Sequence, residues 1–322
     1  MRDKRIDTAL EAWQVLARRS GYDDASFQRV THWHKKDARR SHIILHMRDN
    51  EGMSLILKQI QRPTDINSFQ DVVRAQRIAA FSLRHQDYAR VPKVLGHDSQ
   101  LRAYLTEYAA GRTAFDLCSG TRDRAQILKS AGRWLSEYHS VNEQERRIYQ
   151  PKFMVQHLQK LAEQVKNGER KIRGQKLFRY YVDQIAETAK SHEGRESVIS
   201  SKHGDMNLRN ILLSNDRAWA VDFNTPSYAP VGFDIVRFLL NYSEIFADIK
   251  GIKSGNVIPK EDFDAFFQGY KLVGPDDPSV QFLLKVQLLT DWNRLPHDLL
   301  DTSATNLVRF RRIKQISKIA FE

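Results

Sequence analysis

The chain contains very little cysteine. Cys118 is the single cysteine among 322 residues, so the chain can form no internal disulfide and no multi-cysteine zinc or iron–sulfur site. Apolar runs long enough to span a bilayer are also missing, because the most apolar stretches, residues 43–45 and 55–57, are only strand-sized. No apolar segment of a secretory signal follows the charged N-terminus. We therefore expect no transmembrane segment and a reducing, cytoplasmic compartment.

Several motifs of enzymes and metal proteins are absent. The 15 glycines include no G-x-G-x-x-G, and the closest approach to a P-loop has Pro275 where lysine is required. No G-x-S-x-G is present to supply an acyl-transfer nucleophile. His42 and His46 are four apart in a strand-like run without a nearby set of cysteines or carboxylates, which argues against a metal pair. Dinucleotide binding, P-loop chemistry and serine hydrolysis are disfavoured.

Positive charge is in excess. The formal net charge is +12, and this balance favours an anionic partner without identifying it. The charge is spread along the chain and accompanies no recognised nucleic-acid module, so nucleic-acid binding is not expected.

The first part of the chain has a strand-rich pattern. Residues 41–47 and 54–60 are β-rich and joined by a turn-like pentapeptide, which predicts an antiparallel hairpin. Further strands are predicted at 91–95 and 103–108, and helices at 8–19 and 66–84. After a connector near residues 106–112 the pattern turns helical, with predicted helices at 127–139, 153–190 (interrupted at Gly168 and Gly174), 233–242, 263–272 and 307–320.

A second hairpin signal lies within the helical part. The short runs 211–213 and 218–221 are separated by a turn, and they follow an irregular segment at 201–210. We therefore predict an α+β protein with a small β-rich N-lobe, residues 1–108, and a larger, mainly helical C-lobe, residues 109–322.

One group of polar residues has the composition that phosphoryl transfer requires. His203-Gly204-Asp205 is followed by Asn210, and Val221-Asp222-Phe223 comes at the end of the second short strand. Transfer from ATP needs an oriented hydroxyl, a place for its proton and a divalent cation on the phosphates. Mg²⁺ prefers oxygen ligands, so one amide and one carboxylate can suffice on the protein side. A tight hairpin would bring Asn210 and Asp222 near one point, with Asp205 across the loop.

These motifs resemble the catalytic and metal loops of the aminoglycoside phosphotransferase and choline kinase superfamily, relatives of protein kinases. Residues 105–111 resemble the interlobe hinge of that family, the helix ending at His139 resembles the helix that supports the catalytic loop, and residues 55–58 resemble the strand that bears the ATP-binding lysine. The segment 232–235 resembles the terminal Asp-aliphatic motif. The resemblance covers roughly residues 40–245 and implies a bilobal, protein-kinase-like fold.

The resemblance also implies roles for individual residues. Asp205 would be the catalytic base or would orient the hydroxyl, Asn210 and Asp222 would hold Mg²⁺, and Lys58 would contact the α- and β-phosphates of ATP. Asp234 would be a structural carboxylate near the catalytic loop. Adenine would meet the backbone of three hinge residues: Glu107, Tyr108 and Ala109.

The predicted function is that of a Mg²⁺-dependent small-molecule kinase. It would transfer the ATP γ-phosphoryl group to a hydroxyl of a metabolite, sugar or aminoglycoside-like acceptor. An anionic acceptor would suit a set of basic residues that could equally form a solvated face, namely Lys152, Arg170, Lys171 and Arg173. Asp291 and Trp292 are a hint of an aromatic cage for a choline-like cation. The sequence does not indicate an oligomeric state.

Two departures from the family pattern motivate an alternative. Residues 31–41 contain no glycine, so phosphate contacts there would fall to backbone N–H groups or to basic side chains such as Lys35, Lys36, Arg39 and Arg40. The helix at 66–84 has no Glu to pair with Lys58, which leaves Asp71 or Gln76. The alternative is a catalytically weak or inactive kinase-like nucleotide-binding protein.

Simpler structural roles are open for the same residues. Asp205 and Asn210 are common turn formers, and Lys58 could be a surface lysine on a half-buried strand. His203 fits a hydrogen-bonded scaffold better than an acid–base catalyst. The basic face of the helix at 307–320 fits either a solvated surface or a membrane or partner contact.

Overall fold

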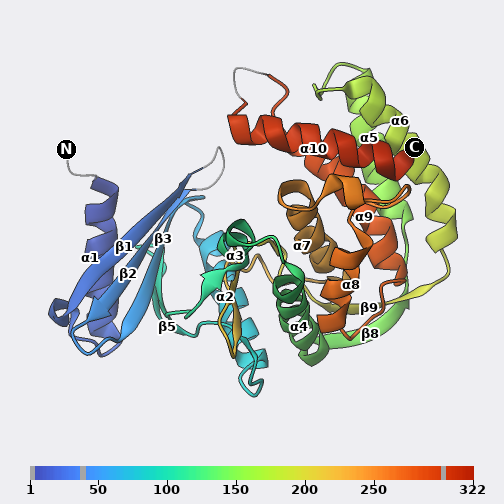
Figure 1. The fold of residues 1–322 in the computed structure, drawn as a ribbon. Coiled ribbons are helices and arrows are strands. Elements are labelled where there is room, and N and C mark those ends of the chain that lie inside the picture. Colours follow the sequence, from blue (N-terminus) through green and yellow to red (C-terminus); the bar gives the residue numbers. More distant parts are fainter. Residues whose placement is uncertain (1–3, 37–40, 299–301) are drawn as a thin grey trace. The chain divides into compact units, whose positions relative to one another are not determined.

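The computed structural model describes residues 4–36, 41–298 and 302–322. The chain divides into two compact units, the first formed by Met1–Gly111 with Ser214–Pro226 and the second by Arg112–Leu213 with Ser227–Glu322. The first unit carries a five-stranded sheet and the second most of the helices (Figure 1). The boundary between the two lobes, expected between residues 108 and 109, stays a prediction.

The sheet of the first unit is antiparallel throughout, with strand order β1-β2-β3-β6-β5. Its strands are β1 (Phe27–Lys36), β2 (Ser41–Asp49), β3 (Ser54–Arg62), β5 (Val94–Asp98) and β6 (Ala103–Glu107). The predicted hairpin is confirmed by the pairing of β2 with β3, in which Ile44 lies opposite Lys58. The strand predicted at 91–95 begins later, at Val94, just beyond the Val91-Pro92-Lys93 segment.

Helix α1 (Lys4–Arg19) covers one face of this sheet. Its apolar stripe, which includes Trp13 and Leu16, packs with Leu57 and Leu105 in one buried cluster. Because successive side chains of a strand point to opposite faces, Lys58 faces away from α1. The face of β3 that carries Lys58 thus lies outside the first core.

Helix α2 (Ile66–Ser82) contributes a second, smaller core in which Phe69 and Val73 pack with Tyr104. Short strands β4 (Ala89–Arg90) and β11 (Ala218–Ala220) pair in parallel in the same unit. Asp222 follows β11 by two residues, so the pairing of β11 with β4 helps to position the Asp222 backbone.

The second unit contains eight α-helices in its described residues (Figure 1). They are α3 (Ala114–Gly120), α4 (Ala125–Val141), α5 (Lys152–Lys166), α6 (Gln175–Ala189), α7 (Gly232–Ile245), α8 (Lys260–Gly269), α9 (Pro278–Arg294) and α10 (Ala304–Phe321). The predicted break between α5 and α6 is confirmed, because Gly168 and Gly174 both have positive φ.

The strands of the second unit are short. They are β7 (Arg112–Thr113), β8 (Glu143–Ile148), β9 (Glu196–Ser201), β10 (Ile211–Leu213) and β12 (Tyr228–Pro230). β9 lies between β8 and β12, and β10 pairs with β7. β10 and β11 form where short strands were predicted, and a turn closed by the Ser214 N–H and the Arg217 carbonyl follows β10.

Helices α4 and α8 cross at two glycines. A Cβ atom at Gly132 would lie 2.3 Å from the Phe266 carbonyl oxygen, and one at Gly269 would lie 1.9 Å from the Lys129 carbonyl oxygen. Side chains at either position would force the helices apart. This close approach places His139, near the end of α4, where its Nδ1 is 2.9 Å from the Tyr270 hydroxyl.

Candidate active site

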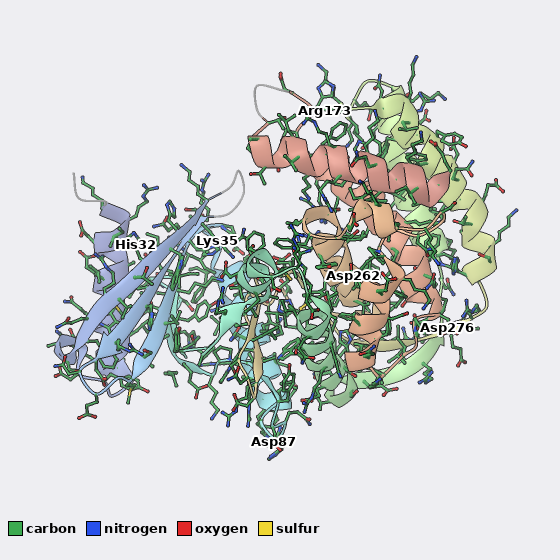
Figure 2. The ribbon with its side chains drawn as sticks, viewed as in Figure 1. His32, Lys35, Asp87, Arg173, Asp262 and Asp276 are labelled. Atoms are coloured by element: carbon green, nitrogen blue, oxygen red, sulfur yellow. The ribbon has the colours of Figure 1, made fainter. Side chains whose placement is uncertain are left out.

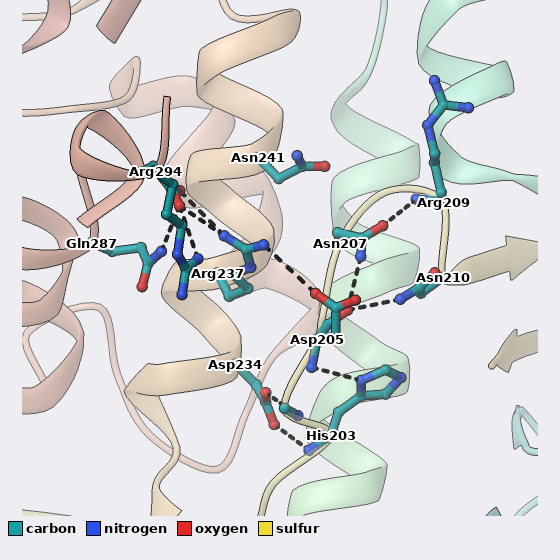
Figure 3. A network of polar contacts seen from close by, with 12 residues as sticks. His203, Asp205, Asn207, Arg209, Asn210, Asp234, Arg237, Asn241, Gln287 and Arg294 are labelled. Atoms are coloured by element: carbon teal, nitrogen blue, oxygen red, sulfur yellow. Dashed lines mark hydrogen bonds and ion pairs between the residues drawn. The ribbon is translucent and has the colours of Figure 1, made fainter. Parts of the chain in front are cut away.

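The predicted catalytic loop is tied to the first turn of α7. The Asp234 carboxylate, buried to 2% exposure, accepts hydrogen bonds from the N–H groups of His203 (2.6 Å) and Gly204 (2.9 Å) (Figure 3). Its Oδ2 also lies 3.3 Å from His139 Nε2. Burial raises the pKa of Asp234, but His139, His203 and the Gly204 N–H together outweigh this effect, and the pKa falls below its usual value. The structural role predicted for Asp234 is confirmed.

Asp205 is held by its backbone and presents its carboxylate outward. Its N–H donates to His203 Nδ1 (3.3 Å), and its carbonyl accepts from the side-chain amides of Asn207 and Asn210 (both 2.9 Å). The side chain is 28% exposed, and Arg237 Nη2 lies 3.6 Å from Oδ1 (Figure 3). The carboxylate is therefore fixed yet accessible, as a group that accepts a proton must be. His203, fully buried, is part of the scaffold.

Asn210 is oriented by the same loop. Its Nδ2 donates to the Asp205 carbonyl, and its backbone N–H donates to the Asn207 carbonyl (3.1 Å). Since the nitrogen of the amide is used inside the loop, Oδ1 is the atom left for an external partner. A neutral amide oxygen at this position suits a hard divalent cation.

The first unit contains a buried ion pair between Lys58 and Asp222. Lys58 is only 8% exposed, and its Nζ donates to Asp222 Oδ1. Burial lowers the pKa of Lys58, but the charge of Asp222 reverses this effect and raises it overall. Burial likewise raises the pKa of Asp222, but the ammonium groups of Lys58 and Lys35 hold it well below its usual range. Both groups are therefore charged, and Lys58 is no surface lysine.

Asp222 also has an unusual backbone. Its φ is +65°, in the left-handed region that side chains other than glycine rarely adopt. Among the described residues only Arg102 shares this property. Such conformations persist where the surrounding structure enforces them, and they cluster at functional sites.

A second lysine reaches the same carboxylate from the end of β1. Lys35 Nζ lies 3.1 Å from Asp222 Oδ2 (Figure 2 labels Lys35). Neither residue proposed as the partner of Lys58 pairs with it. Gln76 instead donates to the Pro92 carbonyl (2.8 Å), and Asp71 forms an ion pair with Arg74 (2.7 Å). Arg39 and Arg40, named as phosphate contacts, lie outside the described residues.

The predicted hinge lies at the end of β6. The Glu107 N–H donates to the Lys93 carbonyl (3.1 Å), and the Glu107 carboxylate accepts from the Lys93 N–H (3.1 Å). The ring of Tyr108 stacks on His46 with centroids 4.5 Å apart, and Ala109 is buried. The segment is thus ordered by its neighbours in the first unit.

The predicted site residues fall into two groups. Asp205 and Asn210 belong to the second unit, and the nucleotide-side residues Lys58, Asp222 and the hinge belong to the first. Within each unit the structure brings its members together as described. The convergence of Asn210 and Asp222 on one metal stays a prediction.

The sequence did not reveal a charged cluster behind Asp205. Asp291, buried on α9, accepts from Arg237 (2.9 Å), Arg294 (3.1 Å) and Gln287 (3.0 Å) (Figure 3). Arg309 of α10 lies 3.4 Å from Asp291 Oδ2. A charged residue among the buried apolar positions of a helix, such as Arg237 in α7 or Asp291 in α9, is the signal that could have indicated it.

Glu244 extends this cluster and accepts a hydrogen bond from Arg309 (2.6 Å). It is 1% exposed, and burial, together with the charge of Asp291, raises its pKa to about 8. Between about pH 4.5 and 8, Glu244 is therefore protonated in the folded protein and ionised in the unfolded protein. The contribution of Glu244 to the free energy of unfolding is therefore expected to fall as pH rises from about 4.5 to 8.

We expect Glu244→Gln to remove that pH dependence. The amide keeps an acceptor for Arg309 and cannot ionise, so the melting temperature of the variant should fall less between pH 5 and pH 9 than that of the wild type. Thermal unfolding at both pH values measures the difference, with the exposed Glu187→Gln as control. Equal pH dependence in the wild type and Glu244→Gln would show that Glu244 titrates normally.

Other residues singled out by sequence have structural partners. Arg170 donates to Asn293 (2.9 Å), and Arg173 donates to Thr302 (3.0 Å). Trp292 is buried and donates to the Arg173 carbonyl (2.8 Å), so the hint of an aromatic cage at Asp291 and Trp292 is wrong. Arg309 of α10 donates to the Glu244 carboxylate of α7. Arg312 donates to the carbonyls of Ser243, in α7, and of Ala247, just beyond that helix. Part of the basic face of α10 therefore packs inward.

The comparisons with known proteins identify the family. The model of the phosphotransferase enzyme family (APH) matches residues 45–282, which span the Lys58 strand, the hinge, both predicted loops and Asp234. The chain belongs to this family. The resemblance noted from the motifs is thereby confirmed. No curated protein sequence matches the chain significantly.

Several solved structures share the fold of this chain. A choline/ethanolamine kinase family protein from Mesorhizobium loti is 15% identical, with a TM-score of 0.57 and coverage of 97% of this chain and 94% of that one. Macrolide 2′-phosphotransferase MphH from Brachybacterium faecium is 15% identical, with a TM-score of 0.57 and coverage of 95% and 97%. The amicoumacin kinase hAmiN, in complex with AMP-PNP, Ca²⁺ and Ami, is 16% identical, with a TM-score of 0.54 and coverage of 97% and 93%.

These similarities confirm the predicted α+β, protein-kinase-like fold class of this family member. Within the described ranges, no helix has both the length and the hydropathy needed to cross a bilayer.

Proposed function

We propose that this phosphotransferase-family chain is a Mg²⁺-dependent kinase that transfers the γ-phosphoryl group of ATP to a hydroxyl of a small-molecule acceptor. The observation that carries the proposal is Asp205, whose carboxylate is partly exposed on a loop pinned by Asp234, in a chain of the phosphotransferase family. The acceptor hydroxyl would donate its proton toward Asp205 as its oxygen attacks the γ-phosphorus.

The residues present fit a divalent cation by their chemistry. Asn210 offers a neutral amide oxygen, and Asp222 offers a carboxylate whose low pKa keeps it ionised. A bound Mg²⁺ would supply charge neutralisation on the ATP phosphates. Asn210 and Asp222 would hold it.

The remaining nucleotide contacts come from the first unit. Lys58 is charged and held by Asp222 and Tyr104, and its ammonium group would contact the α- and β-phosphates. Lys35 would supply a further cation from the end of β1. The backbone of Glu107, Tyr108 and Ala109 would bind adenine, since the strand end that holds them is ordered.

A specific contact favours a second candidate, a weak or inactive nucleotide-binding protein. Both carboxylate oxygens of Asp222 have a lysine partner, Lys58 on one and Lys35 on the other. If Lys35 kept this place, it would compete with a metal for Asp222. Nucleotide would then bind without efficient transfer.

Two measurements test the first proposal against the second. Millimolar MgATP should raise the melting temperature, because a ligand at 100 times its Kd stabilises the folded state by about 2.7 kcal/mol. ADP release should then depend on an added alcohol from a panel of metabolites, sugars and aminoglycosides, and should stop when EDTA removes the metal. Stabilisation without alcohol-dependent ADP release favours the inactive protein, and the absence of both contradicts a nucleotide-binding role.

A further inference from the structure

An arginine side chain lies beside the carboxylate that would receive the acceptor's proton. Arg237 projects from α7 toward Asp205, with Nη2 3.6 Å from Oδ1 (Figure 3). This distance gives an electrostatic contact but is too long for a hydrogen bond. Among the described residues, the hydrogen bonds of Arg237 use Nη1 and none uses Nη2, and the side chain is 25% exposed. The N–H donors on this side of the guanidinium therefore face the place where an acceptor would bind.

The other side of the same guanidinium is fixed. Arg237 Nη1 donates to both oxygens of Asp291, at 2.9 and 3.3 Å, and Asp291 is only 1% exposed. Gln287 donates to the same carboxylate, so Asp291 is itself held in place. An arginine anchored in this way loses little conformational entropy when it binds a ligand. The arrangement is that of a prepared binding group.

The charges around Arg237 leave one positive charge to balance. Three guanidinium groups, those of Arg237, Arg294 and Arg309, lie against the buried acids Asp291 and Glu244, and the Asp205 carboxylate lies on the other side of Arg237. Burial and the charge of Asp291 raise the pKa of Glu244 to about 8, so at pH 7 the three guanidinium groups face mainly two carboxylates, those of Asp291 and Asp205. An anionic group of a ligand in contact with Arg237 Nη2 would balance the remaining charge.

We propose that Arg237 is the anion-binding group of the acceptor site, and that the acceptor is an alcohol that carries a carboxylate or phosphate a few bonds from its reacting hydroxyl. This inference rests on the proposed kinase function and names its substrate class. The acid group would accept hydrogen bonds from Arg237 while the hydroxyl donates to Asp205. The hydroxyl oxygen then forms a bond to the γ-phosphorus, the bond from that phosphorus to the β-phosphate oxygen breaks, and the products are a phosphate ester, ADP and a proton.

The experiment compares alcohols of one skeleton and different charge. The probes are glycerol, D-glycerate, glycerol 3-phosphate and the amine 2-amino-1,3-propanediol, each with MgATP. Wild-type protein should be stabilised in thermal shift only by the anionic probes and should release ADP fastest with them. Absence of any shift from both anionic probes, or a preference for glycerol or the amine, would overturn the inference.

Variants separate anion binding from support of Asp205. Arg237→Gln should raise KM for the preferred anionic alcohol by about 10-fold or more, and Arg237→Lys should recover part of that loss. Arg179→Gln, on the exposed face of α6, serves as the matched control and should behave as the wild type. An equal fall of kcat for every acceptor with KM unchanged would make Arg237 a brace for Asp205 and would overturn anion binding.

The outcomes also distinguish this inference from the function on which it rests. Phosphorylation of neutral or cationic alcohols with no response to anions leaves the kinase proposal standing and removes the anionic acceptor. No stabilisation by MgATP and no ADP release with any alcohol removes the kinase proposal itself, and the inference falls with it.

Discussion

Asp205→Asn is expected to lower the rate of phosphoryl transfer by a factor of about 10²–10⁴, the usual contribution of a general base. Asparagine has the same shape and keeps the backbone contacts of the loop, since Asp205 is held through its N–H and carbonyl rather than its carboxylate. The variant cannot accept the proton of the acceptor hydroxyl. Acceptor-dependent ADP release at saturating MgATP measures the loss.

The control separates chemistry from folding. Asp183→Asn alters an exposed acid on α6 and should retain full transfer. The melting temperature of Asp205→Asn, and its shift with MgATP, should stay close to those of the wild type because the carboxylate makes no buried bond. Transfer in Asp205→Asn at the wild-type rate would mean that another group receives the proton.

Asp222→Ala is expected to destabilise the first unit by about 3–5 kcal/mol, the typical cost of breaking a buried ion pair from one side. Lys58 would lose its carboxylate partner at 8% exposure, and the second ammonium contact, from Lys35, would also be lost. Urea unfolding at pH 7 measures the change. Asp71→Ala, which breaks the exposed pair with Arg74, should cost at most about 1 kcal/mol.

The effect of Asp222→Ala should depend on pH in one direction. The pKa of Asp222 is lowered in the folded protein, so its stabilising contribution is present above the unfolded pKa of about 3.9 and is lost as pH falls toward the folded pKa. The gap between wild type and variant should therefore shrink in acid. A gap that stays constant from pH 7 down to pH 2 would contradict the ion pair as its source.

Much of the fold could be predicted because its signals are local. The hairpin of β2 and β3 has β-rich runs on both sides of a short turn, and α4 has an apolar stripe at helical spacing. Strand β8 was not predicted, because all six of its residues are exposed and no alternation of apolar and polar positions marks it. Helix α9 is buried on most sides and has little amphipathic pattern.

The candidate site was predictable only where its residues are close in sequence. Asp205 and Asn210 lie on one loop, and their roles follow from spacing and resemblance. The contacts of Lys35 with Asp222 and of Arg237 with Asp291 join residues 187 and 54 positions apart. Such pairs depend on tertiary packing, which local patterns do not encode.

The partner of Lys58 illustrates the same limit. The sequence pointed to Asp71 or Gln76 on α2, because the family resemblance placed an acid there. The structure instead pairs Lys58 with Asp222, which also has the rare positive φ. The absence of Glu from α2 therefore did not mean that Lys58 lacks a carboxylate partner.

We propose that Asp205, Asn210 and Asp222 serve one metal–nucleotide site. A crystal structure with Mg²⁺ and a non-hydrolysable ATP analogue tests it most directly. We expect a Mg²⁺ about 2.0–2.1 Å from a carboxylate oxygen of Asp222 and from Asn210 Oδ1, with the γ-phosphate facing Asp205. Nucleotide bound elsewhere, or a metal that touches neither side chain, would contradict it.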